Sequence, residues 1–360
     1  MNKNHYVAII AGGIGSRFWP KSRVGYPKQF LDILNTGKTL IQYTYERFKQ
    51  FVPEENIFIV TSNEYQQIVK EQLTGIKDEN IVCEPSRKNT APCIAYISLK
   101  IKKENPAATL IVAPADHLIL DGSTFEKMCH KAIDFVDKNN ALVTLGITPT
   151  YANTGYGYIQ HEAEPTEDNL YKVRTFTEKP NLELAKAFLE SGDFLWNAGI
   201  FIWKVETIIK SFEQHTPELY EIFAPEIDKL NTAEEKEAIE RIYPLCSSIS
   251  IDYAVMEKAD NVYVIPSSFG WSDLGTWASA YDNLEKDYLG NAIAGDKVLV
   301  IDCTQSMISA PHDKLLVLQG LYDFIVVDTK DVLLICKKDK EQEIKEYVAE
   351  VKRNFGDIHL

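Results

Sequence analysis

A glycine-rich loop with basic residues is the part of this chain with the clearest chemical meaning. The segment Ala11-Gly12-Gly13-Ile14-Gly15-Ser16-Arg17 directly follows the apolar run Tyr6 to Ile10, and Lys28 follows a little later. A strand that runs into such a loop can turn its backbone N–H groups towards phosphate oxygens. Arginine binds those oxygens in pairs, and lysine adds a mobile charge. The loop therefore predicts a nucleotide phosphate site, with an ordinary tight turn as the structural alternative.

Two common nucleotide motifs do not match this loop. The P-loop ends in Gly-Lys-Ser/Thr, but here a serine and an arginine follow Gly15. The dinucleotide fingerprint can be aligned at Gly13 and Gly15, but its third small position is then Phe18. What remains is a loop whose glycines allow the backbone to approach a triphosphate, while Arg17 and Lys28 supply positive charge.

Two aspartates lie in sequence contexts where they could bind a metal ion. Asp116 follows the apolar run Thr109 to Ala113 and Pro114, and Asp273 lies between glycines and tryptophans. Magnesium takes oxygen ligands and shares itself with substrate phosphates. The alternatives are structural, because an aspartate after a strand often caps a helix or forms a turn, and Asp273 could cap a helix that begins at Leu274. Together the two acids are compatible with a magnesium ion bridged between them, and the structural roles stay open as alternatives.

Other polar segments could bind the rest of a substrate. In Phe176-Thr177-Glu178-Lys179-Pro180, Lys179 could hold a monophosphate and Glu178 could accept sugar hydroxyls. Strand alternation predicts that these two side chains point to opposite sides. Asn197 lies in an apolar stretch and must find hydrogen-bond partners if it is buried. The alternatives are an exposed charged pair and an amide bonded to neighbouring backbone.

The segment Glu84-Pro85-Ser86-Arg87-Lys88-Asn89-Thr90-Ala91 lies between an expected strand and an expected helix. Asn89 or Thr90 is a suitable N-cap for that helix, and the polar backbone of the segment could also read a base. His117, His312 and the other histidines show no ligand spacing, and no Ser-His-Asp or Cys-His arrangement is present in the sequence. No histidine is therefore predicted to act in catalysis.

Composition limits the classes of function. The chain has 360 residues and a formal net charge of -14, which argues against sequence-independent binding to nucleic acid. Against this acidic background, a group of basic residues in one segment is expected to face a ligand: Arg17, Lys21, Arg23 and Lys28. Six well separated cysteines give no disulfide framework, no apolar run approaches the roughly 20 residues that span a bilayer, and the amino terminus lacks a secretory signal. We expect a cytoplasmic protein without membrane contact.

The elements that must position these residues alternate along the first 147 residues. Runs that predict strands are Tyr6 to Ala11, Asn56 to Thr61, Ile81 to Cys83, Thr109 to Ala113 and Ala141 to Gly146; stretches that predict helices are Leu40 to Phe51, Glu64 to Leu73, Ala91 to Lys103 and Thr124 to Lys138. This alternation predicts a mostly parallel sheet covered on both faces. Ligands of such sheets bind beyond the carboxyl ends of the strands, where the glycine loop and Asp116 both lie.

Residues from about 155 to 275 read as an insertion that caps this sheet, with strand-like pieces around a polar helical region from Val205 to Ile242. Past about residue 288, short β-runs predict a small all-β domain, and a charged helix is expected from Asp339 to Asn354. The β-runs are Lys297 to Ile301, Ser306 to Ser309, Leu315 to Leu318, Asp323 to Asp328 and Val332 to Cys336.

In this order, the motifs resemble those of the sugar nucleotidyltransferases, and the match covers nearly the whole chain. The segments that carry the resemblance are Ala11 to Pro20, Pro27 to Phe30, Glu84 to Ala91, Pro114 to His117, Gly155 to Ile159, Phe176 to Pro180, Trp196 to Phe201, Ser250 to Tyr253 and Trp271 to Trp277. One departure is Ala198, where the family often has serine, and it loosens any statement about hydrogen bonds there.

The resemblance implies an α/β fold with a Rossmann-like, mostly parallel mixed sheet of the GT-A-like nucleotidyltransferase type. It implies a catalytic domain over residues 1–287 and a short left-handed β-helix-like domain over residues 288–360, which ends in a helix and is used to form a homodimer. Some relatives carry a further isomerase domain; we expect none here, because the chain ends too soon.

Within the family the likeness is greatest to the enzymes that join GTP to mannose 1-phosphate, giving GDP-mannose and pyrophosphate. The alternatives are another sugar 1-phosphate such as glucose or a heptose, another nucleoside triphosphate, or a non-catalytic sensor of nucleotide sugars. A dinucleotide oxidoreductase is disfavoured by Phe18. No protein base is required, because the second pKa of a phosphate monoester is about 6 and the nucleophile is already largely ionised.

The resemblance also implies roles for residues of this chain. The residues implied in catalysis are Arg17, Lys28, Asp116 and Asp273, and the two aspartates would hold Mg²⁺. Those implied in nucleotide binding are Ala11, Gly12, Gly13, Gly15, Ser16, Arg17, Lys28, Glu84, Pro85, Arg87, Asn89, Thr90, Pro114 and Asp116. Those implied in sugar phosphate binding are Gly155, Tyr156, Glu178, Lys179, Asn197 and Gly199.

Overall fold

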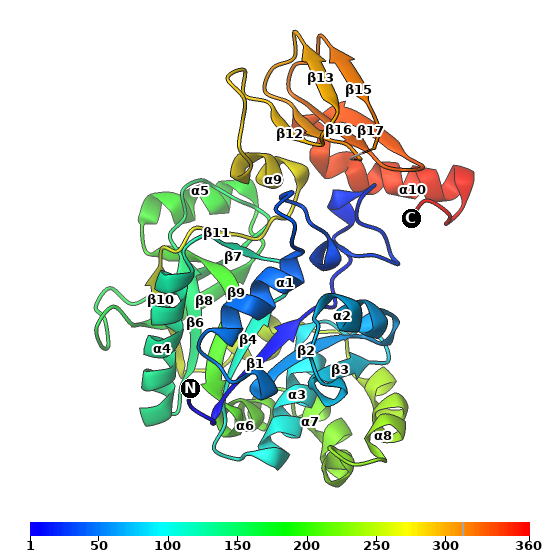
Figure 1. Cartoon of the computed structure of the whole chain (residues 1–360). Coiled ribbons are helices and arrows are strands. Elements are labelled where there is room, and N and C mark those ends of the chain that lie inside the picture. Colours follow the sequence, from blue (N-terminus) through cyan, green and yellow to red (C-terminus); the bar gives the residue numbers. More distant parts are fainter. Residues whose placement is uncertain (312) are drawn as a thin grey trace. The chain divides into compact units, whose positions relative to one another are not determined.

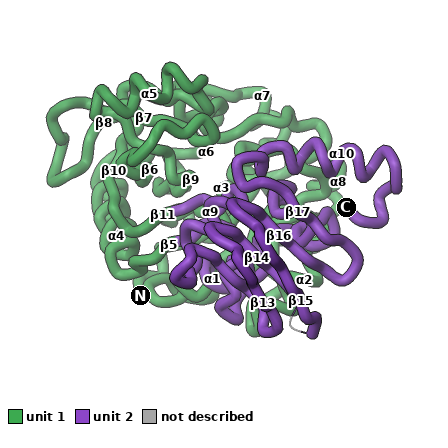
Figure 2. The backbone as a smooth tube through the Cα atoms, turned by 90° about the horizontal axis from the view of Figure 1, so that it is seen from above, with its two compact units in different colours: residues 1–12, 45–114, 119–271 green, residues 13–44, 115–118, 272–360 purple. Residues whose placement is uncertain are grey.

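The structure, a computed structural model, describes residues 1–311 and 313–360, so His312 lies outside the described residues. The described chain divides into two compact units, which Figure 2 colours separately. Unit 1 comprises Met1–Gly12, Tyr45–Pro114 and Ile119–Trp271, and unit 2 comprises Gly13–Thr44, Ala115–Leu118 and Ser272–Leu360. Unit 2 therefore contains most of the glycine loop and the Asp116 segment as well as the carboxyl-terminal region. The boundary between residues 287 and 288 stays a prediction about domains.

Unit 1 is built on a nine-stranded sheet with the strand order β3-β2-β1-β4-β9-β6-β10-β8-β7 (Figure 1). Its strands are β1 (His5–Ile10), β2 (Ile57–Ser62), β3 (Ile81–Glu84), β4 (Thr109–Pro114), β6 (Leu142–Ile147), β7 (Gly157–His161), β8 (Tyr171–Glu178), β9 (Phe194–Lys204) and β10 (Val262–Ser267). Strand β1 is parallel to β2 and β4, β2 is parallel to β3, and β6 is parallel to β10. Strand β9 is antiparallel to β4, β6 and β7, and β8 is antiparallel to β7 and β10. The sheet is therefore mixed.

The region expected to cap the sheet is in fact part of it. Residues 157–267 supply β7, β8, β9 and β10, and β9 lies between β4 and β6. Phe201 of β9 pairs with Val112 on one side and with Thr144 on the other. A strand flanked on both edges and covered on both faces buries consecutive side chains, and Ile200 to Trp203 are all buried. The apolar run was visible in the sequence, but its neighbours across the sheet were not.

The helices predicted between the early strands are confirmed, with ends shifted by a few residues. The helices that lie wholly or partly in unit 1 are α1 (Leu40–Lys49), α2 (Gln66–Gln72), α3 (Thr90–Glu104), α4 (Gly122–Lys138), α5 (Leu182–Ser191), α6 (Val205–His215), α7 (Pro217–Phe223) and α8 (Glu235–Ile242). One core cluster joins apolar side chains of α3, α6 and α7 to β1, β2, β4 and β9. Within the described residues, none of the helices combines the length and the apolar character needed to cross a membrane.

Unit 2 contains the small β-region and two further helices. Its elements are β12 (Ala292–Ala294), β13 (Val298–Ile301), β14 (Met307–Ser309), β15 (Leu316–Gln319), β16 (Phe324–Asp328), β17 (Leu333–Lys337), α9 (Trp277–Asn283) and α10 (Ile344–Phe355), and the short strands β5 (Leu118–Ile119) and β11 (Trp271–Ser272) lie at unit boundaries. One sheet has the order β12-β14-β16-β17 and the other pairs β13 with β15. The predicted β-runs are therefore confirmed, and β12 is an additional strand that was not predicted. The terminal helix is confirmed from Ile344 onward, whereas its first predicted turn is the 3₁₀ helix η9 (Lys338–Glu343).

The core of unit 2 explains why Phe18 does not fit a dinucleotide fingerprint. Phe18 is fully buried, and its ring meets that of Trp277 edge to face with centroids 4.9 Å apart. The same cluster contains Met307 of β14 and Ile325 of β16. The large aromatic ring therefore anchors the end of the glycine loop in the core that the carboxyl-terminal β-region provides.

Candidate functional site

The glycine loop closes against Lys28 through one residue in a left-handed conformation. Gly15 has φ 66° and ψ 41° and precedes the short 3₁₀ helix η1 (Ser16–Phe18). A Cβ atom on Gly15 would collide with the Cβ atom of Lys28, so only glycine fits here. The Ser22 hydroxyl donates to the Ile14 carbonyl at 2.6 Å and holds the other side of the loop.

Lys28 brings both predicted metal-binding segments together. Its Nζ atom lies 2.8 Å from Asp116 Oδ2, and it donates to the carbonyl oxygens of Asp273 at 2.8 Å and Leu274 at 3.0 Å. An ammonium group has three N–H donors, so these three contacts use all of them. The structure therefore places Lys28, Asp116 and the Asp273 backbone in one cluster, with the Lys28 ammonium directed at protein oxygens.

The charge state of Asp116 follows from these neighbours. Burial opposes ionisation, but the nearby Lys28 ammonium and His117 outweigh it, so the pKa of Asp116 is lowered. The His117 Nε2 atom lies 3.9 Å from Asp116 Oδ1. Asp116 is therefore an ionised oxygen donor at neutral pH, and its side chain retains 28% exposure.

Asp273 is held in a strained turn and does not cap α9. Its Oδ1 atom accepts the Gly275 N–H at 3.0 Å, while the cap of α9 is Thr276, which forms a reciprocal capping box with Ser279. Leu274 has φ 42°, an unusual value for a bulky side chain. Because the Leu274 carbonyl accepts from Lys28, this backbone conformation takes part in building the cluster.

These residues fit a divalent cation of the magnesium type. Within residues 1–311 and 313–360 there is no group of three or more His, Cys, Asp or Glu side chains that would form a protein-only metal cage. Mg²⁺ is usually held by one or two carboxylates together with substrate phosphates. The ionised Asp116 and the nearby Asp273 match that donor set.

The basic residues of the loop have different environments. Arg17 Nε is buried and has no hydrogen-bond partner in the described part of the chain, which suits contact with an anion. Arg23, expected to face a ligand, instead forms a two-point ion pair with Asp331, at 2.8 and 2.6 Å. The expectation for Arg23 was wrong because its planar guanidinium group binds the carboxylate of Asp331, which lies far away in the sequence. Lys21 is also affected by its surroundings, because burial lowers the pKa of its ammonium group.

The segment after β3 presents a buried carboxyl group. Glu84 accepts a hydrogen bond from the Tyr243 hydroxyl through Oε1, and its Oε2 would lie 3.6 Å from a Cβ atom on Gly12. Burial raises the pKa of Glu84 to about 7, although Tyr243 and Arg87 act in the opposite direction. Pro85 follows at the end of β3. Glu84 is thus the acceptor that this segment turns towards the first residues of the glycine loop.

Other residues of the nucleotide set have structural contacts. Asn89 is the N-cap of α3, as one of the alternatives predicted, and Thr90 Oγ1 accepts the Ile251 N–H at 2.8 Å. Arg87 stacks on Tyr65, with its guanidinium 5.5 Å from the ring centre. Ala11 donates its N–H to the Val60 carbonyl at 2.8 Å, and Pro114 pairs with Ile10 in the sheet.

The predicted sugar phosphate residues meet at one end of β7, β8 and β9. Asn197 donates from Nδ2 to Asp252 Oδ1 at 2.8 Å, while its Oδ1 accepts the Gly199 N–H at 3.0 Å. A Cβ atom on Gly157 would lie 2.6 Å from Glu178 Oε2 and 3.4 Å from Asn197 Cβ. Asn197 is partly buried, and these two hydrogen bonds fix the orientation of its amide.

Glu178 and Lys179 do not point apart as strand alternation predicts. Lys179 Nζ lies 2.8 Å from Glu178 Oε1. Lys179 has φ 47°, just after β8 ends, and this left-handed residue breaks the alternation. Nearby, the Tyr156 ring contacts Trp196 and Trp271 with centroids 5.0 and 5.2 Å apart, and the Gly155 N–H donates to Asn153 Oδ1 at 2.7 Å.

Two residues in these clusters have no role assigned from the sequence. Asp252 begins a π-helical turn, η8 (Asp252–Met256), in the Ser250–Tyr253 motif, and burial with the nearby Glu178 raises its pKa to about 6. Its position in that motif, one of the segments that carry the family resemblance, is the feature of the sequence that could have identified Asp252. Tyr243 contacts Glu84 across 159 sequence positions, and no local pattern marks it.

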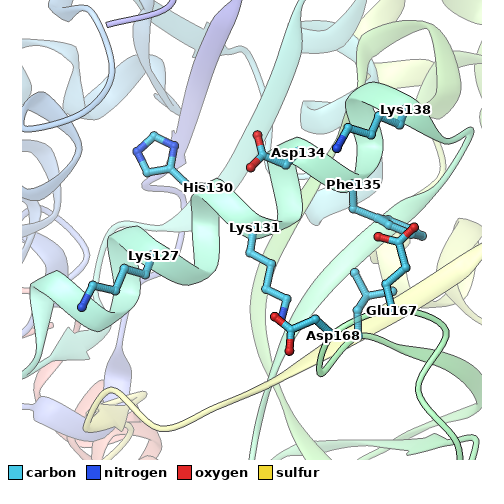
Figure 3. Close-up of a pocket in the computed structure, with 9 residues that line it drawn as sticks. Lys127, His130, Lys131, Asp134, Phe135, Lys138, Glu167 and Asp168 are labelled. Carbon is cyan, nitrogen blue, oxygen red and sulfur yellow. The ribbon is translucent and has the colours of Figure 1, made fainter.

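A separate surface cavity of about 460 Å³ runs along α4 (Figure 3). Lys131 points from the helix to Asp168, and their charged atoms are 3.0 Å apart. The residues that line this cavity include none of the predicted site residues: Lys127, His130, Lys131, Asp134, Phe135, Lys138, Glu167, Asp168 and Leu170.

Comparison with known families covers both parts of the chain. Residues 6–288 match the family described as nucleotidyl transferase, and residues 296–351 match the family described as MannoseP isomerase/GMP-like beta-helix domain. The second match agrees with the β-rich region of unit 2.

Individual proteins give the same picture. A mannose-1-phosphate guanylyltransferase from Escherichia coli is 35% identical over 348 residues, covering 94% of this chain and 74% of that protein. One from Salmonella montevideo is 37% identical over 366 residues, covering 98% of this chain and 75% of that protein. A crystal structure of mannose-1-phosphate geranyltransferase from Thermus thermophilus has 29% identity and a TM-score of 0.87, covering 97% of this chain and 99% of that one. The chain therefore belongs to the nucleotidyl transferase family, and within it to the mannose-1-phosphate guanylyltransferases.

Proposed function

We propose that this protein transfers GMP from GTP to α-D-mannose 1-phosphate, giving GDP-mannose and pyrophosphate. The names of its relatives support the substrates. The observation that carries the proposal is the Lys28 cluster, in which one buried ammonium group joins Asp116 to the Asp273 turn beside the glycine loop. Such a cluster suits phosphoryl transfer, where catalysis consists mainly of positioning and charge neutralisation.

In this reaction an oxygen of mannose 1-phosphate attacks the α-phosphorus of GTP, and the bond to the β-phosphate oxygen breaks. Asp116 and Asp273 would hold Mg²⁺, and the ion would supply positive charge to neutralise the phosphates. The backbone N–H groups of the loop and the buried Arg17 Nε donate to phosphate oxygens. Lys28 keeps Asp116 ionised and oriented. The nucleophile is already largely ionised at neutral pH, so no side chain has to remove a proton.

Further residues of the predicted site are assigned to substrate recognition. We assign Glu84 to the guanine base, because guanine presents N–H donors that a carboxylate accepts. The fixed Asn197 amide and the Glu178 carboxylate suit sugar hydroxyls, and Lys179 supplies a positive charge for the sugar phosphate. The remaining nucleotide residues are assigned to the phosphates and ribose: Ala11, Gly12, Gly13, Gly15, Ser16, Pro85, Arg87, Asn89, Thr90 and Pro114. The remaining sugar residues are Gly155, Tyr156 and Gly199.

A pyrophosphate-release assay tests this function. Four nucleoside triphosphates are each paired with mannose, glucose and heptose 1-phosphates in the presence of Mg²⁺. We expect turnover with GTP and mannose 1-phosphate, loss of turnover with EDTA and its recovery with excess Mg²⁺. No turnover with any pair would reject the enzymatic function. A preference for another pair would show that the protein uses those substrates in place of GTP and mannose 1-phosphate.

The metal assignment is tested with Asp273→Asn, which we expect to lower turnover by about 100-fold or more. Asp168→Asn is the matched control, because Asp168 has an almost fully exposed side chain paired with Lys131. It makes the same chemical change outside the site. Normal activity in Asp273→Asn would remove that residue from the metal site.

We also propose that the protein is a cytoplasmic homodimer whose β-domain is a left-handed β-helix that forms the interface. Strands β13 and β15 carry exposed apolar side chains, with Leu299 at 51% and Val317 at 57% exposure, which supports contact with a second copy. We expect a dimer mass by light scattering and a monomer mass for the double variant Leu299→Lys and Val317→Lys. A dimer mass for the variant would contradict this interface.

A further inference from the structure

Tyr243 is a buried phenol whose hydroxyl reaches the candidate base site. It begins the short 3₁₀ helix η7 (Tyr243–Leu245), and its side chain is fully buried. The hydroxyl donates to Glu84 Oε1 at the end of β3. The Tyr243 ring packs edge to face against Tyr96 and Phe223, with centroids 6.4 and 6.2 Å apart. These rings hold the phenol in place, so its hydroxyl has a fixed direction.

This contact makes the two oxygens of Glu84 different. Oε1 accepts the Tyr243 O–H, whereas Oε2 takes no part in that bond and would lie 3.6 Å from a Cβ atom on Gly12. Because Gly12 has no side chain, space is left between its backbone and Oε2. The carboxylate therefore offers one defined oxygen on the side of the glycine loop.

A single fixed acceptor distinguishes guanine from adenine. Guanine carries adjacent N1–H and 2-amino donors, whereas adenine has a lone pair at N1. An ionised Glu84 Oε2 accepts from guanine but repels the adenine N1 lone pair. A buried polar group left without its partner is the strongest basis for rejecting a close analogue.

The same discrimination depends on the ionisation of Glu84. Burial raises the pKa of Glu84 to about 7, while the hydrogen bond from Tyr243 and the charge of Arg87 lower it. Other titratable groups near this pair, among the described residues, include Cys83 of β3, Cys93 and Tyr96 of α3, and Cys246, next to η7. Removal of the Tyr243 hydroxyl would leave Glu84 protonated over a wider pH range.

We propose that Tyr243 is a positioning residue for base selection, which orients Glu84 and keeps it an acceptor for guanine. This inference rests on the proposed function and adds to it the source of nucleotide specificity. Tyr243 acts through Glu84 and does not itself contact the substrate.

The test compares Tyr243→Phe with the unaltered full-length protein. Steady-state rates with GTP and with ATP are measured from pH 6 to 9 at saturating mannose 1-phosphate and Mg²⁺, and GTP affinity is measured by calorimetry. We expect the variant to raise KM for GTP at pH 7 by about 10-fold, as for loss of a hydrogen bond to a charged group, with kcat unchanged. KM should fall again as pH rises, and the preference for GTP over ATP should shrink at neutral pH.

Tyr96→Phe is the matched control. The Tyr96 hydroxyl donates to Glu235 Oε1 at 2.5 Å, so this variant also removes a tyrosine–glutamate hydrogen bond, here a part-buried one, from a tyrosine of the same core cluster. It leaves the Glu84 contact intact, and KM for GTP and its pH profile should not change. Equal effects of the two variants on KM would reduce Tyr243 to a structural residue and overturn the proposal.

Other outcomes are equally decisive. If Tyr243→Phe does not fold, Glu84→Gln replaces it and should give a KM for GTP that does not vary with pH; a pH profile like that of the unaltered protein would refute the proposal. If the unaltered protein turns over GTP and Tyr243→Phe has the same KM and pH profile, only this inference fails. If the unaltered protein turns over no nucleotide and calorimetry detects no GTP binding, the proposed function fails as well.

Discussion

At the scale of single residues, Lys28 organises the candidate phosphate site. Its ammonium group is nearly inaccessible and makes three contacts, to Asp116 Oδ2 and to the carbonyls of Asp273 and Leu274. A buried charge is stabilised only when its donors are satisfied, so loss of this residue leaves several acceptors without a partner. Lys28 therefore supports the geometry of both aspartate segments.

We expect Lys28→Met to lower the free energy of unfolding by about 1.5–3 kcal/mol, the range for hydrogen bonds to charged groups. Urea denaturation of Lys28→Met, Asp116→Asn and the double variant measures this. The double variant should lower the free energy of unfolding by less than the sum of the two single variants, because each single change leaves the other side chain unpaired. Additive effects would show that the two side chains do not interact.

The pKa of Asp116 predicts a pH dependence of stability. Its folded-state pKa is lowered because Lys28 and His117 outweigh burial. The unfolded state then binds the proton more tightly, so the ion pair stabilises the fold above the ordinary aspartate pKa of about 3.9 and this stabilisation is lost as pH falls through the lowered value. The difference in unfolding free energy between the unaltered protein and Asp116→Asn should shrink as pH falls from 6 to 3. A constant difference would contradict the ion-pair explanation.

At the scale of elements, the turn at Gly15 sets the shape of the phosphate loop. It combines a left-handed backbone with a close approach to the stem of Lys28, and each feature by itself favours glycine. The loop then enters η1 and ends at Phe18 in the core of unit 2. The loop is thereby held at both positions, and this fixes the directions of its backbone N–H groups.

Gly15→Ala should lower the free energy of unfolding by about 1–3 kcal/mol and should abolish measurable GTP binding, because the added Cβ strains the backbone and displaces Lys28. Thermal unfolding and calorimetric titration with GTP measure the two effects. Gly25→Ala is the matched control, since a Cβ atom there would have nothing within 4 Å. If Gly15→Ala binds GTP as well as this control does, the turn is not required.

At the scale of the whole molecule, the glycine loop shares its core with the carboxyl-terminal β-region. Phe18, Trp19 and Trp277 belong to the same cluster as Met307 and Ile325, and all lie in unit 2. Removal of the chain beyond residue 288 would expose that core. Point substitutions are therefore the appropriate test of how the β-region supports the loop.

Ile325→Ala should lower the free energy of unfolding by about 2–5 kcal/mol, because it leaves a cavity beside aromatic side chains of the loop. It should also raise KM for GTP. Urea denaturation followed by tryptophan fluorescence measures the stability. Ile358→Ala makes the same change at a side chain with 78% exposure and should change stability by less than about 0.5 kcal/mol. Equal free energies of unfolding for the two variants would show that Ile325 does not stabilise the core.

The sequence by itself determined the elements and the chemical character of the site. Alternating apolar runs predicted the strands and helices of the first half, because backbone period and burial are local properties. The glycine loop with Arg17, together with Asp116, indicated phosphate chemistry, because the chemical types of those residues restrict what they can bind. The order of the motifs indicated the family, and the comparison with known proteins confirmed the family.

Only the tertiary structure decided which side chains meet. It placed β9 inside the sheet, paired Arg23 with Asp331, and turned Lys179 back to Glu178. It also joined Tyr243 to Glu84 across 159 positions. These contacts depend on strand order, on left-handed residues at strand ends and on packing between distant segments. No local pattern of residue types contains that information, because each contact is selected by the free energy of the whole fold.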